Sequence, residues 1–344
     1  MANILIAHGG APTSVINSSL AGVLSELKKQ GFKGKILGAR FGSTGIVNED
    51  FIDLTNVSDD KIELLKRTPG SAIGTSRLPL EKSDYEKIVD ILVRNDIKYV
   101  LFNGGNGSMD TCGNIYNLAR EKGIICVGIP KTIDNDIMET DHAPGYASCA
   151  RYLACSVKEA AQDIKGLPIH VSIIESMGRN VGWITAAAAL ARENSNDAPD
   201  FIYCPEYAFD EDKFLSDTEN LFRKKGGVTI VASEGLRDTK GNPIVEPIFS
   251  VGRATYFGDV SSHLANLIIK KLGIKARSEK PGILQRASTT FASKIDVEEA
   301  FIAGVEAVKA ALAGVSGVMV AFERVSTSPY VVKTKLVDIK KVML

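Results

Sequence analysis

The residues best suited to chemistry stand together in the stretch Pro130-Lys131-Thr132-Ile133-Asp134-Asn135-Asp136. It brings two carboxylates, a hydroxyl and a lysine into one short segment. A carboxylate can take the proton of a nearby alcohol, and carboxylates beside a lysine suit the binding of Mg²⁺ and phosphate. The segment therefore predicts proton abstraction combined with phosphate chemistry.

The acidic segment follows an apolar run, residues 124–129, that has the composition of a buried strand. Proline ends the run at position 130, because proline cannot donate a hydrogen bond to a sheet. In open α/β sheets, ligands bind at the carboxyl ends of the strands. We therefore expect the acidic segment to be a loop at this edge of a sheet.

Short apolar runs alternate with amphipathic stretches along most of the chain. Strands are predicted at residues 3–7, 34–37, 98–102, 124–129, 170–174, 201–203, 228–232 and 317–322. Helices are predicted at residues 15–29, 82–95, 109–122, 146–164, 210–224, 259–272 and 297–313. This alternation predicts an α/β fold with mainly parallel sheets and helices on both faces.

Composition limits the possible partners. The chain has 344 residues, 44% hydrophobic and 24% charged, which is ordinary for a globular protein with a large core. Lys+Arg and Asp+Glu each number 41, so no net positive charge favours nucleic acid or an anionic membrane. Local cations must hold any anionic substrate. We expect neither nucleic acid nor a membrane as a partner.

Features of targeting and redox chemistry indicate the cytoplasm. The start of the chain lacks a basic segment followed by an apolar one, so we expect no signal peptide, and no apolar run reaches bilayer length. Five cysteines without a CxxC pair favour free, buried thiols over a disulfide or zinc framework.

Two glycine clusters each fall between a predicted strand and a predicted helix. They are Gly9-Gly10 and Gly104-Gly105-Asn106-Gly107-Ser108. Glycine lets the backbone approach a ligand, and the N-terminus of a helix binds anions. Neither cluster matches the Walker pattern or the dinucleotide fingerprint. With the acidic loop, they predict a phosphate site of another kind.

These motifs resemble the phosphofructokinase family, which has ATP-dependent and pyrophosphate-dependent members. The resemblance spans nearly the whole chain and keeps the family's order. It is carried by Gly9-Gly10 with Asn17, Gly74-Thr75-Ser76-Arg77, the Gly104–Ser108 cluster, the 132–136 loop, Met177-Gly178-Arg179 before Gly182-Trp183, Glu234-Gly235 and Gln285-Arg286.

The resemblance implies phosphoryl transfer to the 1-hydroxyl of fructose 6-phosphate, a step of glycolysis, with Mg²⁺ as cofactor. Asp134 would be the base, Thr132 would stabilise the transferring group, and Arg77 would bridge the donor and acceptor phosphates. Asp136 would orient the acceptor and, with Asn106, hold the metal. Taken alone, the two aspartates could equally be turn formers and the arginines surface cations.

The remaining roles implied by the resemblance concern the donor and the sugar. The donor cradle would comprise Gly10, Gly105, Asn106, Gly107, Ser108 and Lys131. The sugar phosphate would bind Thr132, Asp134, Asp136, Met177, Gly178, Arg179 and Glu234. Its distal phosphate would be held by Arg277 and Arg286, whose guanidinium groups match phosphate oxygens.

The resemblance also implies two Rossmann-like, three-layer α/β/α domains. Residues 1–145 with about 286–335 would form the larger, donor-binding domain. Residues 146–285 with about 336–344 would form the smaller, sugar-binding domain, with the site in the cleft. The family's acceptor phosphate is held from two subunits, so a homodimer or homotetramer is expected.

The sequence departs from the family pattern around the donor. Asn106 stands where many members have aspartate and brings no charge to the metal. Gly107 leaves room for a nucleotide, since pyrophosphate users typically have an acidic residue there. Lys131 and the surrounding sequence are typical of pyrophosphate users. Weighed together, these signals favour ATP over pyrophosphate by a narrow margin.

Two further departures concern the acceptor. His170 and Ile283 stand where the family usually has an arginine and a histidine or tyrosine that contact the 6-phosphate. A charged hydrogen bond is worth about 1.5–3 kcal/mol, so losing two would weaken binding considerably. Either Lys165 or Arg151 compensates, or the acceptor is a different sugar or sugar phosphate. A second class of function is a catalytically silent, sugar-phosphate-binding regulatory homologue.

Overall fold

Two α/β units make up the chain in the computed structural model, which describes residues 2–251 and 254–343. The first unit comprises Met1–Ser148 and Arg286–Leu344, and the second comprises Cys149–Gln285. Each has its own sheet and its own apolar core, so each is described by itself.

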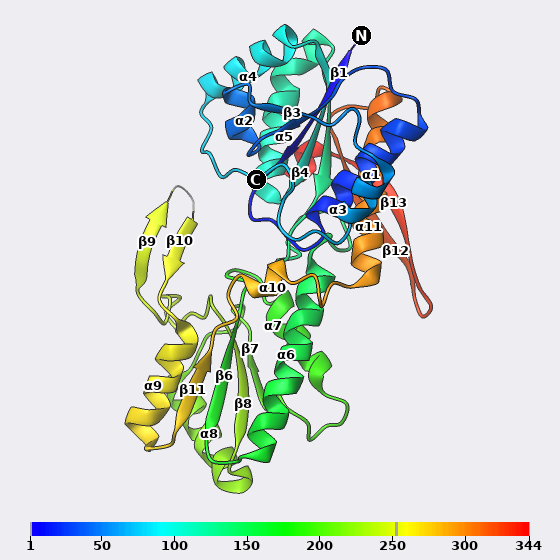
Figure 1. Ribbon diagram of the computed structural model, residues 1–344. Helices are drawn as coiled ribbons and strands as arrows, with labels where there is room; N and C mark the ends of the chain where they lie inside the picture. The colour runs from blue at the N-terminus through cyan, green and yellow to red at the C-terminus, as the bar shows by residue number, and fades with distance from the viewer. Residues whose placement is uncertain (1, 252–253, 344) are drawn as a thin grey trace. The chain divides into compact units, whose positions relative to one another are not determined.

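The sheet of the first unit has seven strands in the order β13-β12-β5-β4-β1-β2-β3 (Figure 1). The five inner strands are parallel, and the two outermost, β3 and β13, run antiparallel to their neighbours. The strands are β1 (Asn3–His8), β2 (Ile36–Ala39), β3 (Phe51–Asp53), β4 (Ile97–Gly104), β5 (Ile125–Pro130), β12 (Val318–Thr327) and β13 (Tyr330–Asp338).

Both faces of this sheet are apolar, as a parallel sheet buried between helices requires. In β1, Leu5 and Ala7 face one core, while Ile4 and Ile6 face the other. The first core is covered by α2 (Ser43–Val47), α4 (Lys82–Arg94) and α5 (Asn106–Ala119); the second by α1 (Ile16–Lys29), α3 (Asp59–Leu65) and α11 (Lys294–Leu312). Figure 1 shows α1 and α11 on the opposite side of the sheet from α4 and α5.

The second unit has a parallel four-stranded sheet in the order β11-β6-β8-β7, namely β11 (Ala276–Glu279), β6 (Val171–Ser176), β8 (Val228–Ser233) and β7 (Phe201–Tyr203). Phe214 and Leu264 pack α8 (Glu211–Lys225) and α9 (Val260–Leu272) on one face. α6 (Tyr146–Gly166) lies over the other face. The unit also holds α7 (Trp183–Ala187), the first half of α10 (Leu284–Ala287), and the hairpin of β9 (Pro247–Val251) and β10 (Ala254–Phe257).

The prediction of mainly parallel sheets with helices on both faces is confirmed, and each of the predicted strands and helices is present. The sequence pattern missed short or edge elements, including β3, β11, β13 and the β9–β10 hairpin. Trp183 is an apolar residue at the start of α7, yet it is 53% exposed and does not belong to a core.

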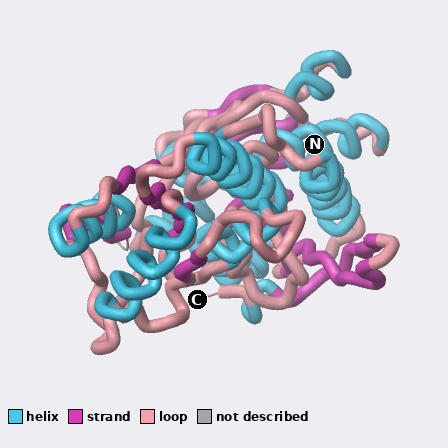
Figure 2. Tube along the Cα trace, turned by 90° about the horizontal axis from the view of Figure 1, so that it is seen from below, coloured by secondary structure: helices cyan, strands magenta, loops and turns pink. Residues whose placement is uncertain are grey.

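The assignment of residues 336–344 to the smaller domain was wrong. β13 pairs antiparallel with β12 from Tyr330 to Asp338, and its residue Leu336 lies opposite Val320. Beyond it, Ile339 and Val342 are buried in the core of the first unit. The β12–β13 hairpin is long, and its turn extends past the helices in both views (Figure 1, Figure 2).

Two further features bear on the expectations from composition. None of the five cysteines forms a disulfide, and Cys112, Cys126 and Cys149 are buried, as predicted. Within residues 2–251 and 254–343, no helix has both the length and the apolar character needed to cross a membrane.

Candidate active site

Three loops of the first unit meet because their strands end at the same level. His8 of β1 pairs with Asn103 of β4, and Gly104 pairs with Pro130 of β5. The backbone N–H of Gly9 donates to Asn103 O at 2.8 Å, and that of Lys131 donates to Gly104 O at 2.9 Å. The two glycine clusters and the acidic loop therefore share one carboxyl edge of the sheet.

The turn after β1 is joined to the segment that carries Arg77. Gly10 adopts a φ of 72°, which favours glycine, and its N–H donates to Ser76 O at 2.9 Å. Asn17 of α1 supports the same segment from inside, since its side chain bonds Thr68 O and the N–H of Ala72. Arg77 itself is exposed and follows directly after these anchors.

The second glycine cluster forms the start of α5. Gly105 precedes the helix, which begins at Asn106, earlier than the apolar pattern indicated. A Cβ on Gly104 would lie 2.0 Å from the Ser108 Oγ, so the strand end and the first helical turn touch. A Cβ on Gly107 would meet no atom of the described chain within 4 Å. The helix N-terminus thus presents open backbone to an incoming anion.

Lys131 lies beneath this cradle. Its side chain is only 3% exposed, and its Nζ donates to Ala11 O at 2.6 Å. Burial, together with the charges of Arg77 and Arg286, lowers the pKa of Lys131 to about 7, although Asp134 opposes the shift. Three cations and one carboxylate of the candidate site therefore share one electrostatic environment.

His8 of β1 lies beside this lysine. It is fully buried, as expected for a packed residue at a strand end, and its Nδ1 bonds the Ser71 Oγ at 2.8 Å. Burial and the charge of Lys131 lower the pKa of His8 to about 3, so the ring is neutral.

The acidic loop holds its two carboxylates in different surroundings. The Asp134 N–H donates to the Thr132 Oγ1 at 3.1 Å, which closes a tight turn. Asn135 follows with a φ of 57°, a left-handed conformation that asparagine tolerates. Asp136 accepts a hydrogen bond from Asn106; desolvation nevertheless raises the pKa of Asp136.

The pairing of Asn106 and Asp136 bears on metal binding. Mg²⁺ is commonly held by one or two carboxylates together with substrate phosphates, and these two side chains supply one carboxylate and one amide oxygen. Among the residues that the structure describes, no group of three or more His, Cys, Asp or Glu could hold a metal. The donor set therefore fits a metal that arrives with a phosphate ligand.

In the second unit, the sugar-binding candidates gather at the carboxyl edge of β6 and β8. Ser176 and Ser233 end these strands opposite one another. The Ser233 Oγ donates to Gly178 O at 2.8 Å, and the Glu234 N–H donates to Ser176 O at 2.9 Å. The structure thus brings together Met177, Gly178, Arg179 and Glu234.

Arg277 is not part of that group. It lies in β11 opposite Ser172 of β6, five residues before Met177. At a rise of about 3.3 Å per residue, that separation is about 16 Å along the sheet. The backbone of Arg277 therefore lies well back along the sheet from the segment that begins at Met177.

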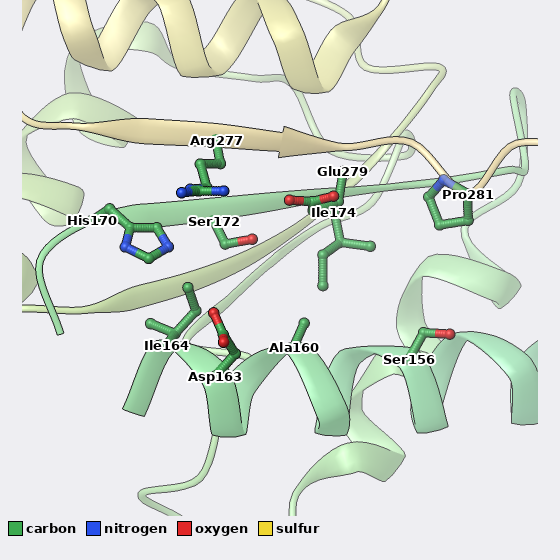
Figure 3. A pocket seen from close by; sticks show the side chains of 10 residues that line it. All are labelled: Ser156, Ala160, Asp163, Ile164, His170, Ser172, Ile174, Arg277, Glu279 and Pro281. Carbon is green, nitrogen blue, oxygen red and sulfur yellow. The ribbon is translucent and has the colours of Figure 1, made fainter. Parts of the chain in front are cut away.

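Arg277 and His170 instead line a pocket of about 320 Å³ between the sheet and α6 (Figure 3). Figure 3 shows both side chains pointing into the pocket from the strand side, with Asp163 and Ile164 of α6 facing them. Burial and the nearby Arg277 and Lys275 lower the pKa of His170, so this ring is neutral near pH 7. The neighbouring Ile283 is 62% exposed.

Several residues that hold the segments of these sites in place were not assigned a role from the sequence. The Gln285 Oε1 accepts from the Met177 N–H at 3.0 Å and so orients the sugar segment. Asp296 and Glu299 of α11 are buried, and bond the segment after the acidic loop. The sequence feature that could have identified Asp296 and Glu299 is their spacing of three residues on an otherwise apolar face of a helix.

Comparison with known proteins settles the family. The family model described as phosphofructokinase matches residues 3–311. The chain belongs to the phosphofructokinase family. A pyrophosphate–fructose 6-phosphate 1-phosphotransferase from Xanthomonas campestris pv. campestris is 39% identical, covering 95% of this chain and 81% of the relative. The chain is therefore a phosphotransferase, and the alternative of a silent binding protein is not supported.

Two other phosphofructokinase relatives help to define the fold and the range of activities. The crystal structure of a pyrophosphate-dependent phosphofructokinase from Marinobacter aquaeolei is 36% identical with a TM-score of 0.90, covering 99% of this chain and 84% of that one. This likeness confirms the predicted fold class. A sulfofructose kinase from Alkalicoccus urumqiensis is 33% identical, covering 95% of this chain and 85% of the relative.

Proposed function

We propose that this phosphofructokinase transfers a phosphoryl group from pyrophosphate to the 1-hydroxyl of fructose 6-phosphate. The observation that carries the proposal is the shared edge of β1, β4 and β5, where a glycine cradle, Lys131 and Asp134 lie together. The names of the Xanthomonas and Marinobacter relatives support pyrophosphate as donor. The narrow preference for ATP drawn from Gly107 is thereby reversed.

In the proposed reaction, the Asp134 carboxylate takes the proton of the sugar 1-hydroxyl. The oxygen then forms a bond to the transferred phosphorus, while the bond from that phosphorus to the bridging oxygen breaks. The sugar gains a second phosphate, inorganic phosphate leaves, and the proton stays on Asp134. General-base help of this kind contributes roughly 10²–10⁴ in rate.

Charge on the phosphoryl oxygens would be offset by fixed groups around the cradle. Arg77 and Lys131 supply cations, the Thr132 hydroxyl supplies a donor, and the first turn of α5 supplies backbone N–H groups. Such groups act without reorganising, because the hydrogen bonds of Gly10 and Lys131 already fix the loops that carry them.

Mg²⁺ would be held by Asp136 and Asn106 together with the donor phosphates, and would neutralise phosphate charge when bound. The amide of Asn106 brings no charge, so Asp136 supplies the only formal charge of this pair. Their hydrogen bond already places both side chains together.

The sugar would be held by Met177, Gly178, Arg179 and Glu234, and its 6-phosphate by Arg286. Arg277 lies about five residues back along the sheet from Met177, at the level of Ser172. We therefore propose that Arg277 serves the acceptor phosphate of a second copy, in the homodimer or homotetramer expected for the family. We expect the assembled enzyme in the cytoplasm.

A matrix of donors and acceptors tests the proposal. Purified enzyme is supplied with pyrophosphate, ATP or ADP against fructose 6-phosphate, fructose and other sugar phosphates, with Mg²⁺. The proposal predicts the highest kcat/KM for pyrophosphate with fructose 6-phosphate. Turnover with other acceptors but none with fructose 6-phosphate would reject the proposed acceptor. A higher kcat/KM for ATP than for pyrophosphate would reject the proposed donor.

ATP is the second candidate donor, because Gly107 leaves open space where an acidic residue would exclude a nucleotide.

Sulfofructose is the second candidate acceptor. His170 is neutral and Ile283 is apolar, so fewer charges face the distal anion than the family pattern provides. A sulfonate carries one negative charge and a phosphate carries up to two, so the matrix includes sulfofructose as a direct competitor.

A further inference from the structure

A short segment, residues 140–145, runs alongside the acidic loop and is called the strap here. The Thr132 N–H donates to Pro144 O at 3.1 Å, and Thr132 forms a β-bridge with Gly145. The Ala143 N–H donates to the Asn135 Oδ1 at 2.9 Å. Asn135 stands between Asp134 and Asp136, so the strap fixes the residue that links the two aspartates.

Two buried carboxylates of α11 hold the strap and the residues after it. Asp296, which is fully buried, accepts from the N–H groups of Gly145 at 2.9 Å and Ser148 at 3.0 Å. Glu299, one turn further along the helix, bonds the His142 Nε2 at 2.5 Å. The helix that covers the second core therefore also anchors the loop at the candidate active site.

His142 is the centre of this anchor. Its Nδ1 lies 2.9 Å from the Asp141 Oδ2, and its ring stacks on Phe322 of β12 at 5.2 Å between centroids. The Tyr330 hydroxyl of β13 donates to the Glu299 Oε1 at 2.6 Å. His142 thus connects the strap to α11, β12 and β13 through a buried network.

The network favours the charged form of the imidazole. Burial alone would lower the pKa of His142, but hydrogen bonds and charges from Glu299 and Asp141 outweigh it and raise the pKa above its usual value. Both ring nitrogens can then donate at once, one to each carboxylate. A neutral ring could donate to only one of them, so the strap would lose one of its two anchoring bonds.

Packing does not by itself explain such a group. Replacing a buried ion pair with apolar residues is often neutral or stabilising, so a buried charged triad is weak evidence for a role in stability. Its best-attested use is to fix one specific arrangement. Here the arrangement that it fixes is the strap beside Asn135.

We propose that His142, held between Glu299 and Asp141, is a positioning residue that sets the geometry of Asp134 and Asp136 through the strap. The inference rests on the proposed function for the roles of those two aspartates. His142 would act on the reacting groups indirectly, through residues 140–145, without contacting the substrate itself. Displacement of a reacting group by about 1 Å can cost as much as 100-fold in rate.

The pH dependence of this device follows from the groups that face the ring. They are Asp141 of the strap, Glu299 of α11, Tyr330 of β13, and, through Asp141, Arg324 of β12. Without the charge of Glu299, only the Asp141 carboxylate opposes the effect of burial on the pKa of the ring. The pKa of His142 should then fall, so that the ring of the variant loses its charge at a lower pH than the ring of the parent and regains it as the pH is lowered.

The variant Glu299→Gln tests the proposal, because it keeps the size of the side chain and removes its charge. Glu26→Gln is the matched control: Glu26 is also a buried helical carboxylate, 3% exposed, and its Oε1 accepts a hydrogen bond from Gln30 at 2.7 Å. It lies near the end of α1, at the edge of the sheet opposite the strand carboxyl ends.

We expect Glu299→Gln to lower kcat about tenfold at pH 8 with KM values within about twofold, since only positioning is lost. The ratio of variant to parent kcat should rise toward one as the pH falls to 6. Glu26→Gln should keep the parent's kcat at both pH values. A ratio that does not change with pH, or an equal loss in Glu26→Gln, would overturn the proposal.

Amide hydrogen exchange gives a readout that does not depend on turnover. Exchange of the Thr132 and Ala143 amides, which donate the two strap bonds, should accelerate about tenfold in Glu299→Gln at pH 8 and not in Glu26→Gln. Unchanged exchange would overturn the positioning role. If the parent enzyme transferred no phosphoryl group to fructose 6-phosphate, the proposed function would fail, while exchange would still decide whether His142 fixes the strap.

Discussion

The Nζ of Lys131 donates a 2.6 Å hydrogen bond to the carbonyl oxygen of Ala11, which joins the end of β5 to the turn after β1. The contact holds a buried ammonium under the glycine cradle, where burial and two arginines lower its pKa to about 7. An incoming phosphate would restore the charge, because an opposite charge nearby favours the protonated form. The lysine is thus both a brace between two loops and a candidate donor ligand.

Replacing Lys131 should weaken donor use in a charge-dependent way. We expect Lys131→Met to lower kcat/KM for pyrophosphate roughly 10- to 100-fold, the loss of one charged hydrogen bond. In the parent, kcat/KM should fall as the pH rises above about 7, because a lysine carries its charge below its pKa and loses it above. Lys131→Arg should move this limb to higher pH.

Initial rates at limiting pyrophosphate between pH 6 and 9 measure both effects, with Lys87→Met on the exposed surface of α4 as the control. An alkaline limb that stays in place in Lys131→Arg would show that another group titrates.

Gly107 should decide whether a nucleotide can act as donor. The open space around its Cβ position predicts that Gly107→Asp folds normally. An acidic residue in the first turn of α5 also interacts favourably with the helix dipole. We expect the variant to lose at least tenfold in any kcat/KM for ATP, through repulsion of the α-phosphate, and to keep pyrophosphate activity within about threefold. Paired assays with the two donors measure this ratio; an unchanged ratio would contradict the assigned position.

Asn106 should set the demand for metal. Its amide and the Asp136 carboxylate lie in hydrogen-bond contact, so Asn106→Asp would place two carboxylates at one point. We expect the Mg²⁺ concentration for half-maximal rate to fall several-fold, because a charged ligand is gained. Titration of activity with Mg²⁺ at saturating substrates measures it, and Asn106→Ala should shift the midpoint the other way. If neither variant shifted the Mg²⁺ midpoint, Asn106 and Asp136 would not be ligands of the metal.

The His142 network should make stability depend on pH. A histidine whose pKa is raised in the folded protein contributes stability that is complete below its unfolded pKa of about 6.5 and is lost as the pH rises through the folded pKa. His142→Gln should therefore lower the melting temperature more at pH 6 than at pH 9. Calorimetry of parent and variant at both pH values checks the sign, and an equal loss at both would show that His142 is not charged.

Much of the fold could be predicted because its signals are local. β1, β4 and β5 each contain an apolar run that ends at glycine or proline, which also located the loops around Gly104 and Pro130. β3 and β13 lie at sheet edges and mix polar with apolar residues, so their sequences carry no clear strand signal. For the same reason, residues 336–344 were assigned to the wrong domain.

The candidate site was predictable only in part. The proximity of Gly10, Gly105 and Lys131 follows from parallel strands that end at one edge, and the order of the motifs indicated it. The low pKa of Lys131 depends on burial, and the anchoring of His142 by Glu299 spans 157 residues of sequence. Neither is visible in residue type or spacing. The position of Arg277, level with Ser172, likewise needed the strand register.

The most direct test is the turnover of Asp134→Asn with pyrophosphate and fructose 6-phosphate, beside Asp90→Asn on the surface of α4 as control. The substitution keeps the shape of the loop and removes the base. We expect kcat to fall at least about 100-fold, with an unchanged melting temperature and KM values within about threefold. A folded Asp134→Asn enzyme that turned over as fast as the control would show that this carboxylate does not accept the proton.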